Sequence, residues 1–333
     1  MMIVSRLFAP LSALFLAAAL ISLFPTDHSS AQSAAPVKVT VGVPTPSVPF
    51  LPPYVAIQKG FDRANGIEIE LRTIPGSVGV QSMVSGGIDF TTSAGSVLNA
   101  GLAGAPVRVL MIMIDKSTYT VYARPEIKGI QDLKGKRIAV DSIGGSQYSE
   151  LLLGFKKIGF NPSDVAIVGL SPSLRVASLE SGAIAASMVA PPQDLTLEKL
   201  GYNRILRLGD HVVGINGGIG VSTALLQSKP ALVDNLVTAA LMGLRTIKEN
   251  RAASLPLIMS YLNVDAGEAA LIYDNNVQAF SDGKSSLATR AEMVAAAAAA
   301  LKSSKGLQPA DIFELGPLDR AYARLQAGGW RAQ

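Results

Sequence analysis

The chain contains no cysteine, and this absence excludes two classes of exported protein. A small fold held by disulfides needs paired cysteines, and a bacterial lipoprotein needs one at its cleavage site. Histidine is nearly absent as well, with only His28 and His211 in the sequence. Without thiols or clustered imidazoles there is no ligand set for an ordinary zinc site, and no Asp-rich loop stands out for calcium. We therefore expect no metal and no cofactor.

Aromatic residues are also scarce, at 6% of the chain, and charged residues make up only 16%. The formal net charge is +4, but the Lys and Arg residues are scattered along the sequence. A nucleic-acid-binding surface usually needs clustered basic residues. The composition therefore argues against nucleic acid as a partner.

The first 31 residues have the pattern of a secretory signal peptide. Arg6 supplies a positive start, Leu7–Phe24 is almost wholly apolar, and small residues follow at 29–31. A membrane anchor is the alternative, because the apolar stretch approaches spanning length. Pro10 and Pro25 favour processing instead. We expect cleavage after residue 31 and a protein exported to the periplasm.

A short internal repeat gives the first indication of architecture. Val80–Ser93 and Val176–Val189 share identical residues at the pairs Val80/Val176, Ser82/Ser178, Ser85/Ser181, Gly86/Gly182 and Ile88/Ile184. Each copy predicts a helix, a glycine that ends it, and a strand of small and β-branched residues. Two such copies predict two α/β lobes that face each other and close on a small molecule.

The order of predicted elements extends this pattern into two lobes. Strands and helices alternate from Val37 to Ile114, and again from Ile130 to Val189, as in open sheets covered by helices. The predicted elements include strands at Val37–Val43, Val107–Ile114 and Arg137–Val140 and a helix over 54–64.

We interpret Tyr119–Arg124 and Gly214–Ser222 as extended crossings, with glycines at a hinge. The chain is helical from Lys229 onward and is expected to return to the first lobe. The predicted lobes are 36–122 with 223–333, and 123–222.

Several short motifs resemble those of a known family. They are Val39–Val43, Pro53–Ala56, Lys59–Phe61, Ser85–Phe90 and Asp132–Val140. In this order and spacing they resemble the substrate-binding proteins of ABC transporters, in the sulfonate/taurine/nitrate and NMT1/THI5-like group. The resemblance implies an α/β fold of the type II periplasmic-binding-protein class, a clamshell of two lobes joined by a hinge. It also implies a small-molecule ligand between the lobes and an ABC permease in the inner membrane as partner.

The sequence departs from that family at two places. An acidic residue is common after Gly-x-Ile in the second copy, and this chain has Ala185. The loop Ser93–Asn99 does not match the sulfonate branch closely. Sulfonates, carboxylates, nitrate and pyrimidine-like or other nitrogen heterocycles all remain open as ligands.

Candidate ligand-binding residues lie in the loops that follow the strands, because ligands of open α/β sheets bind at the carboxyl ends of the strands. The strongest loop is Ser142–Gln147, whose glycines allow close approach and whose Ser146 is a candidate helix cap. Ser93–Ser96 is its counterpart in the first lobe, and Ser77 is a further candidate cap. The full set is Ser47, Pro49, Phe50, Ser77, Ser93, Ala94, Gly95, Ser96, Asp141, Ser142, Gly144, Gly145, Ser146, Gln147, Arg175 and Pro191.

Each of these positions has a plainer structural alternative. Arg175 is able to bind a carboxylate or sulfonate, but an exposed position on its helix is the competing interpretation. Asp141 is able to accept from an amine or amide, but it also fits a structural role at a strand end. The Ser-Gly loops occur widely as ordinary capped turns, and Pro191 fits a stiff exit from a strand.

Three functions fit the pattern to different degrees. The first is a monomeric solute-binding protein whose lobes close on a ligand. The second, a sensory module that serves a receptor, needs the same clamshell. The third is an enzyme on this fold, but the chain has no cysteine, no G-x-S-x-G motif, and only His211 as a base beyond the signal. We expect a binding protein and not an enzyme.

Overall fold

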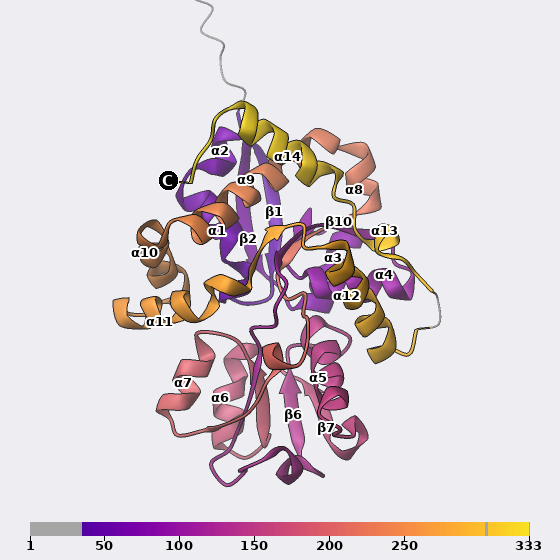
Figure 1. The fold of residues 1–333 in the computed structure, drawn as a ribbon, viewed down its shortest axis with the longest axis vertical. Helices are drawn as coiled ribbons and strands as arrows, with labels where there is room; N and C mark the ends of the chain where they lie inside the picture. The colour runs from indigo at the N-terminus through magenta and orange to yellow at the C-terminus, as the bar shows by residue number, and fades with distance from the viewer. Residues whose placement is uncertain (1–34, 304–305, 333) are drawn as a thin grey trace, which may run out of the picture. The chain divides into compact units, whose positions relative to one another are not determined.

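Residues 35–303 and 306–332 are described by a computed structural model, and their strands form two separate sheets (Figure 1). The predicted signal peptide lies outside the described residues. The first sheet has six strands, in the order β11 (Phe280–Gly283), β4 (Val107–Ile114), β10 (Gly218–Ser222), β3 (Phe90–Thr91), β1 (Val37–Val43) and β2 (Ile67–Thr73). The second has five, in the order β7 (Ala166–Gly169), β6 (Arg137–Val140), β8 (Ala186–Val189), β5 (Thr120–Ala123) and β9 (Asn203–Arg207).

The two sheets share one topology. In the first sheet β1 lies between its parallel partners β2 and β3, and in the second sheet β6 lies in the same way between β7 and β8. An antiparallel strand then follows on the far side of β3 and of β8, which is β10 in one case and β5 in the other. We call the residues around these sheets the first and second lobes. The predicted α/β fold class is confirmed.

The pairing of β5 and β10 differs from the sequence-based interpretation. Thr120–Ala123 and Gly218–Ser222 are strands within the sheets, not extended crossings. By sheet membership β5 belongs with the second lobe and β10 with the first, so both lie across the predicted lobe bounds. Each segment was expected to be a linker because the local sequence pattern does not show which sheet the segment joins. The chain passes between the sheets at residues 115–119, the first crossing, and 211–217, the second crossing.

Helices cover both faces of the first sheet, which explains why its longest strand, β4, is almost wholly buried. One core contains Val39, Leu110 and Leu236, and the other contains Val97, Val109 and Met293. The helices of this lobe are α1 (Leu51–Gln58), α2 (Phe61–Ala64), α3 (Gly76–Val84), α4 (Ala94–Ala103), α8 (Thr223–Ser228), α9 (Pro230–Glu249), α10 (Arg251–Leu262), α11 (Ala266–Asn276), α12 (Leu287–Ala300), α13 (Pro309–Ile312) and α14 (Gly316–Ala327).

The second lobe is smaller, and its helices are α5 (Ser146–Lys157), α6 (Pro172–Glu180) and α7 (Gln193–Lys199). Short 3₁₀ turns complete the two lobes, at η1 (Val48–Phe50), η2 (Ile130–Leu133), η3 (Pro162–Asp164), η4 (Leu208–Asp210) and η5 (Val277–Ala279). None of the helices in the described ranges is both long and apolar enough to cross a bilayer.

The internal repeat is real at the level of structure. Its copies become α3 with β3 and α6 with β8, and the aligned Gly86 and Gly182 both have a positive φ, of 83° and 76°. A residue with a side chain rarely adopts this conformation, so glycine ends both helices for the same reason.

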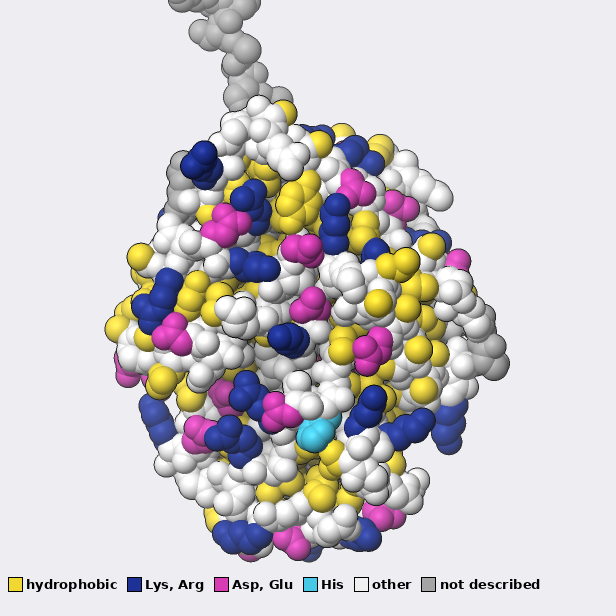
Figure 2. Space-filling view, in the orientation of Figure 1, with side chains coloured by type: hydrophobic (Ala, Val, Ile, Leu, Met, Phe, Trp, Pro, Cys, Tyr) yellow, Lys and Arg dark blue, Asp and Glu magenta, His cyan; other side chains and the backbone are white. Residues whose placement is uncertain are grey.

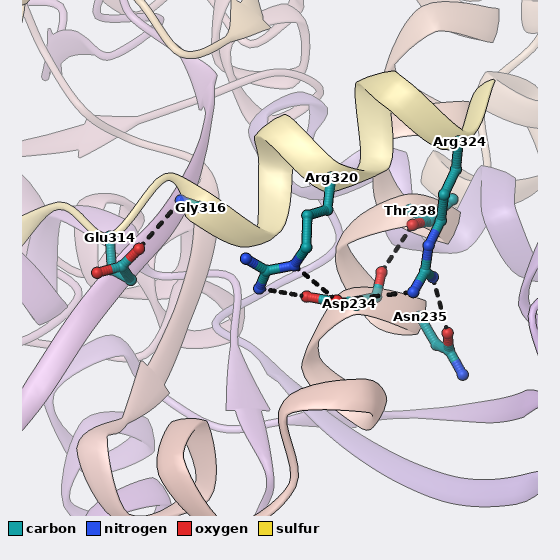
Figure 3. A network of polar contacts seen from close by, with 7 residues as sticks. All are labelled: Asp234, Asn235, Thr238, Glu314, Gly316, Arg320 and Arg324. Atoms are coloured by element: carbon teal, nitrogen blue, oxygen red, sulfur yellow. Dashed lines mark hydrogen bonds and ion pairs between the residues drawn. The ribbon is translucent and has the colours of Figure 1, made fainter. Parts of the chain in front are cut away.

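The helical tail returns to the first lobe, as expected, and polar contacts fix its last helix (Figure 3). Arg320 of α14 binds both carboxylate oxygens of Asp234 on α9 at 2.8 Å, and Arg324 donates to Asn235 at 3.0 Å. Asp234 is nearly buried, so its partners replace the water it loses. The tail also contributes β11, a strand that the helical pattern concealed.

Candidate functional site

A cavity lies between the two lobes, and the first lobe lines it with the proline-rich loop that follows β1. This loop runs from Pro44 into η1, and its prolines restrict the backbone so that the loop is stiff. Phe50 is buried at its end. Ser47 is 2% exposed, and its hydroxyl has no hydrogen-bond partner among the described residues. A buried hydroxyl without a partner is a candidate contact for a polar ligand.

The wall contributed by the second lobe starts where β6 ends. The Asp141 carboxylate accepts from the backbone N–H of Ser142 at 2.7 Å, and Gln147 accepts from the N–H of Asp141 at 2.9 Å. Helix α5 begins at Ser146 with Gly145 as its N-cap, and no side chain caps it. The expected cap by Ser146 is therefore wrong, because Ser146 already lies inside the first turn.

Arg175 of α6 is the largest fully buried side chain of the second lobe, at 1% exposure. Its guanidinium donates to the carbonyls of Leu170 and Met188 at 3.2 and 2.6 Å, and to Gln147 at 3.2 Å. The competing interpretation of an exposed arginine is therefore wrong, because its helix face turns toward β8. These bonds use three of five N–H groups, which leaves two for a ligand.

These loops enclose a cavity of about 230 Å³ between the two lobes. Its apolar lining includes four prolines, and its charged lining consists of Asp141 and Arg175. The complete lining is Pro44, Thr45, Pro46, Ser47, Phe50, Tyr119, Asp141, Gln147, Pro172, Arg175, Ala190, Pro192 and Gln193. We call this the central cavity.

Burial and opposite charge act against each other on the two ionisable groups of the central cavity. Burial raises the pKa of Asp141, and the Arg175 charge opposes that rise. Burial lowers the pKa of Arg175 to about 10, and Asp141 opposes that fall. Arg175 therefore keeps its charge at neutral pH. The cavity offers one buried cation and one buried acid, which together suit a ligand with both donor and acceptor groups.

Two further serines lie beside the central cavity, where α3 and α4 of the first lobe begin. A Cβ added at Gly76 would lie 2.7 Å from Ser96 Oγ, 3.5 Å from Ser93 Oγ and 3.3 Å from Asp141 Oδ2. Both serine hydroxyls are buried, and neither has a hydrogen-bond partner in the part of the chain that the structure describes. Helix α3 begins at Gly76 after Pro75, so the expected cap from the Ser77 region is absent.

Other predicted residues lie where the lobes touch rather than in the central cavity. A Cβ at Gly95 would lie 2.5 Å from that of Ser146 in the opposite lobe, so these two positions are in direct contact. Asn99 of α4, which the sequence did not single out, donates to the carbonyls of Gly144 and Gly145 at 3.0 and 3.1 Å. This amide connects the lobes and was not found because a helical Asn carries no distinctive pattern.

The sixteen predicted positions therefore separate into groups. The central cavity contains Ser47, Phe50, Asp141, Gln147 and Arg175. A groove of about 820 Å³ along α3 and α4 contains Ser77, Ser96 and Gly144. Pro191 lines a third cavity of about 490 Å³ on the other side of its loop. The rest lie in strand-end loops or in the first turns of the helices that follow them: Pro49, Ser93, Ala94, Gly95, Ser142, Gly145 and Ser146. The cavity residues that sequence reasoning missed are Pro44, Thr45, Pro46, Tyr119, Pro192 and Gln193.

No group of three or more metal-ligating side chains occurs within residues 35–303 and 306–332. On the face drawn in Figure 2, Lys and Arg side chains are mixed with Asp and Glu and form no single basic patch.

Comparisons with known proteins place this geometry in a family. The family model described as "NMT1/THI5 like" matches residues 48–253. The riboflavin-binding protein RibY of Chloroflexus aurantiacus is 27% identical over 254 residues, which are 72% of each chain.

Solved structures show the same fold. The alkanesulfonate-binding protein SsuA of Xanthomonas axonopodis, bound to MOPS, has a TM-score of 0.70 and 19% identity, over 84% of this chain and 99% of its own. The desulfurization enzyme DSZB has a TM-score of 0.59 and 18% identity, over 86% and 99%. Binding proteins and an enzyme thus share this architecture. The chain belongs to the NMT1/THI5-like family and has the periplasmic-binding-protein fold.

Proposed function

We propose that this protein is the solute-binding component of an ABC importer and binds a small polar organic molecule in the central cavity. The observation that carries the proposal is a cavity lined by both lobes, into which a buried, unpartnered hydroxyl and a buried arginine both project. Ligand contacts to both walls stabilise the closed arrangement, and a membrane permease then recognises it.

The lining indicates the shape and chemistry of the ligand. On the first lobe, Pro44, Pro46 and Phe50 form a stiff apolar wall, which suits a flat or compact organic body. The opposite wall offers the Asp141 carboxylate as an acceptor and Arg175 as a donor. Sulfonates, carboxylates, nitrate and nitrogen heterocycles remain the classes to test, and riboflavin belongs in the panel because the relative RibY is named for it.

The remaining parts of the proposal follow from this role. We infer export to the periplasm by the signal peptide, a monomeric protein, and a permease of the inner membrane as partner. We infer binding without catalysis, because the chain has no cysteine and only two histidines. A receptor in place of the permease is the alternative, and an adjacent permease gene would favour transport.

A thermal-shift screen of the chain from Gln32 onward tests the proposal. A ligand that binds only the folded state raises the melting temperature with its concentration. We expect one of the four classes, or riboflavin, to do so. Native mass spectrometry of the purified protein checks whether a ligand is already bound. An empty protein that responds to no class contradicts the proposal.

A pair of serine variants then locates the site. Ser47→Ala and Ser187→Ala each remove a buried hydroxyl that has no partner, but only Ser47 lines the central cavity. We expect Ser47→Ala to weaken binding about tenfold, the value of one hydrogen bond, and Ser187→Ala to leave it unchanged. Equal effects of the two variants would place the ligand elsewhere.

A further inference from the structure

Glu150 of α5 is a buried carboxyl group that the central cavity does not use. It is 6% exposed and lies beside both crossings between the lobes. From the first crossing, Ser117 Oγ donates to its Oε2 at 2.6 Å. From the second crossing, Gly214 approaches so closely that an added Cβ would lie 2.7 Å from Oε2 and 3.0 Å from Oε1. One side chain thus touches both crossings.

The surroundings of Glu150 contain nothing that would neutralise a negative charge. It forms no ion pair among the described residues, and its Oε1 is buried without a partner. The small cavity beside it is lined from α4, α12 and the second crossing by residues that do not ionise. Of the neighbouring ionisable groups, Asp141 raises the pKa of Glu150, and Tyr119, whose own pKa Glu150 raises, is an acid as well. An unpaired carboxylate is costly here, whereas an uncharged acid is not.

We propose that Glu150 connects the two crossings as an uncharged carboxylic acid and that its ionisation loosens the closed arrangement of the lobes. In the closed arrangement Oε1 carries the proton and Oε2 accepts from Ser117. When the proton leaves for solvent, a bare carboxylate remains between two backbone segments. The lobes then separate, because separation lets water reach the charge. Glu150 is a positioning residue of the hinge, and this role rests on the proposed ligand-driven closure.

The direction of the pH effect follows from linkage. Burial raises the pKa of Glu150 to about 8, with a smaller rise from Asp141, and the bond from Ser117 opposes the rise. Closure that keeps the group protonated is favoured at low pH. The ratio of closed to open protein falls by up to about tenfold per pH unit as the pH rises toward 8, and it levels off above that value.

Opening and closing of the lobes can be measured without knowing the ligand. The chain has no cysteine, so Val78→Cys on the first lobe and Leu174→Cys on the second give two unique sites for spin labels. Both positions are about half exposed. In the ligand-free protein, we expect the distance between the labels to lengthen from pH 6 to pH 9. We expect Glu150→Gln, which cannot ionise, to keep the short distance throughout.

Two further variants make the test specific. Glu249→Gln changes an exposed acid on α9 and should keep the pH dependence of the parent protein. Ser117→Ala removes the bond that favours the charged form, so it should move the midpoint to higher pH; this variant also carries the test if Glu150→Gln does not fold. A parent distance that ignores pH, or a pH response that survives in Glu150→Gln, overturns the proposal. The spin-label measurement uses no ligand. Its result can therefore be told apart from a failure of the ligand screen, which tests the proposed function.

Discussion

The two copies of the repeat build the same backbone but differ at the residue that directly precedes each copy. Gly86 and Gly182 end equivalent helices, and β3 and β8 occupy equivalent places in their sheets. One position before the shared valine, however, the first copy has Gly79 and the second has Arg175. Gly79 packs against Thr91, whereas Arg175 reaches Met188 and Gln147.

This difference extends to the whole central cavity. The first lobe lines it with prolines, Thr45, Ser47 and Phe50, none of which is charged. The second lobe contributes both charged groups, Asp141 and Arg175, together with two glutamines and the apolar residues Pro172, Ala190 and Pro192. The shared topology places the loops that follow β1 and β6 at the same cavity, and individual positions in those loops set its chemistry. The cavity between two similar lobes is therefore asymmetric, because both of its charged groups come from the second lobe.

The largest expected effect comes from removing the arginine that separates the two copies. Arg175→Met leaves the carbonyls of Leu170 and Met188 without donors in a buried place, which should cost about 3–5 kcal/mol of unfolding free energy. Denaturant unfolding measures it. Arg251→Met on the surface of the first lobe is the control and should cost less than about 1 kcal/mol. Similar losses from both variants would show that Arg175 is not part of the buried network.

A second comparison uses one glycine from each lobe at their contact. In Gly95→Ala the new Cβ would meet the Ile215 carbonyl at 2.4 Å and Ser146 Cβ at 2.5 Å, which are fixed atoms. In Gly145→Ala the nearest atom is the Ser142 hydroxyl at 2.6 Å, which can rotate. We expect Gly95→Ala to cost about 1–3 kcal/mol and to hold the lobes apart, and Gly145→Ala to cost less. Small-angle scattering and thermal unfolding test this order, and a reversed order would contradict it.

Variants of two asparagines distinguish an effect on closure of the lobes from an effect on folding. Asn99 donates to carbonyls of the opposite lobe, whereas Asn203 donates to the carbonyls of Pro125 and Ile127 within its own lobe at 2.9 and 2.8 Å. Each change to Ala should cost about 1–2 kcal/mol of stability. Only Asn99→Ala should also weaken ligand binding, by about tenfold, as measured by calorimetry once a ligand is known. Equal losses of affinity would show that the bonds of Asn99 do not hold the closed form.

The smallest effect is expected from the tail, which only the first lobe has. Arg320→Ala removes the two bonds to Asp234, but the arginine is about half exposed, so the loss should be about 0.5–1 kcal/mol. Hydrogen exchange should increase in α14 and not in the second lobe. Arg320→Lys should restore only part of the protection, because lysine lacks the forked geometry. Faster exchange throughout both lobes would contradict a local role.

Local pattern was sufficient for many elements. The strands at Val37–Val43, Val107–Ile114 and Arg137–Val140 were predicted with the bounds that the structure shows. Others were missed for identifiable reasons. The helix predicted over 54–64 is divided, because Gly60 has a positive φ. The strand β11 was hidden in a segment of helical composition, and it forms because β4 offers it an edge.

Only some residues of the candidate site could be predicted from the sequence, for a different reason. Asp141 and Gln147 follow a strand and a glycine-rich loop, which is a recognisable position. Tyr119 lies on a crossing and Gln193 begins α7, and neither carries a local signal. Glu150 is similar, since an acid within an amphipathic helix predicts an exposed side chain. Their roles depend on segments far away in the chain.

The sequence by itself determined the α/β class, the duplicated helix–glycine–strand unit and the family, because these depend on periodicity, glycine conformation and short motifs. The tertiary structure alone decided that β5 and β10 enter opposite sheets and that Arg175 turns inward. It also decided that Glu150 meets both crossings. Those outcomes depend on which surfaces become covered when the chain passes twice between the lobes. Burial by distant segments produces no recognisable pattern in the local sequence.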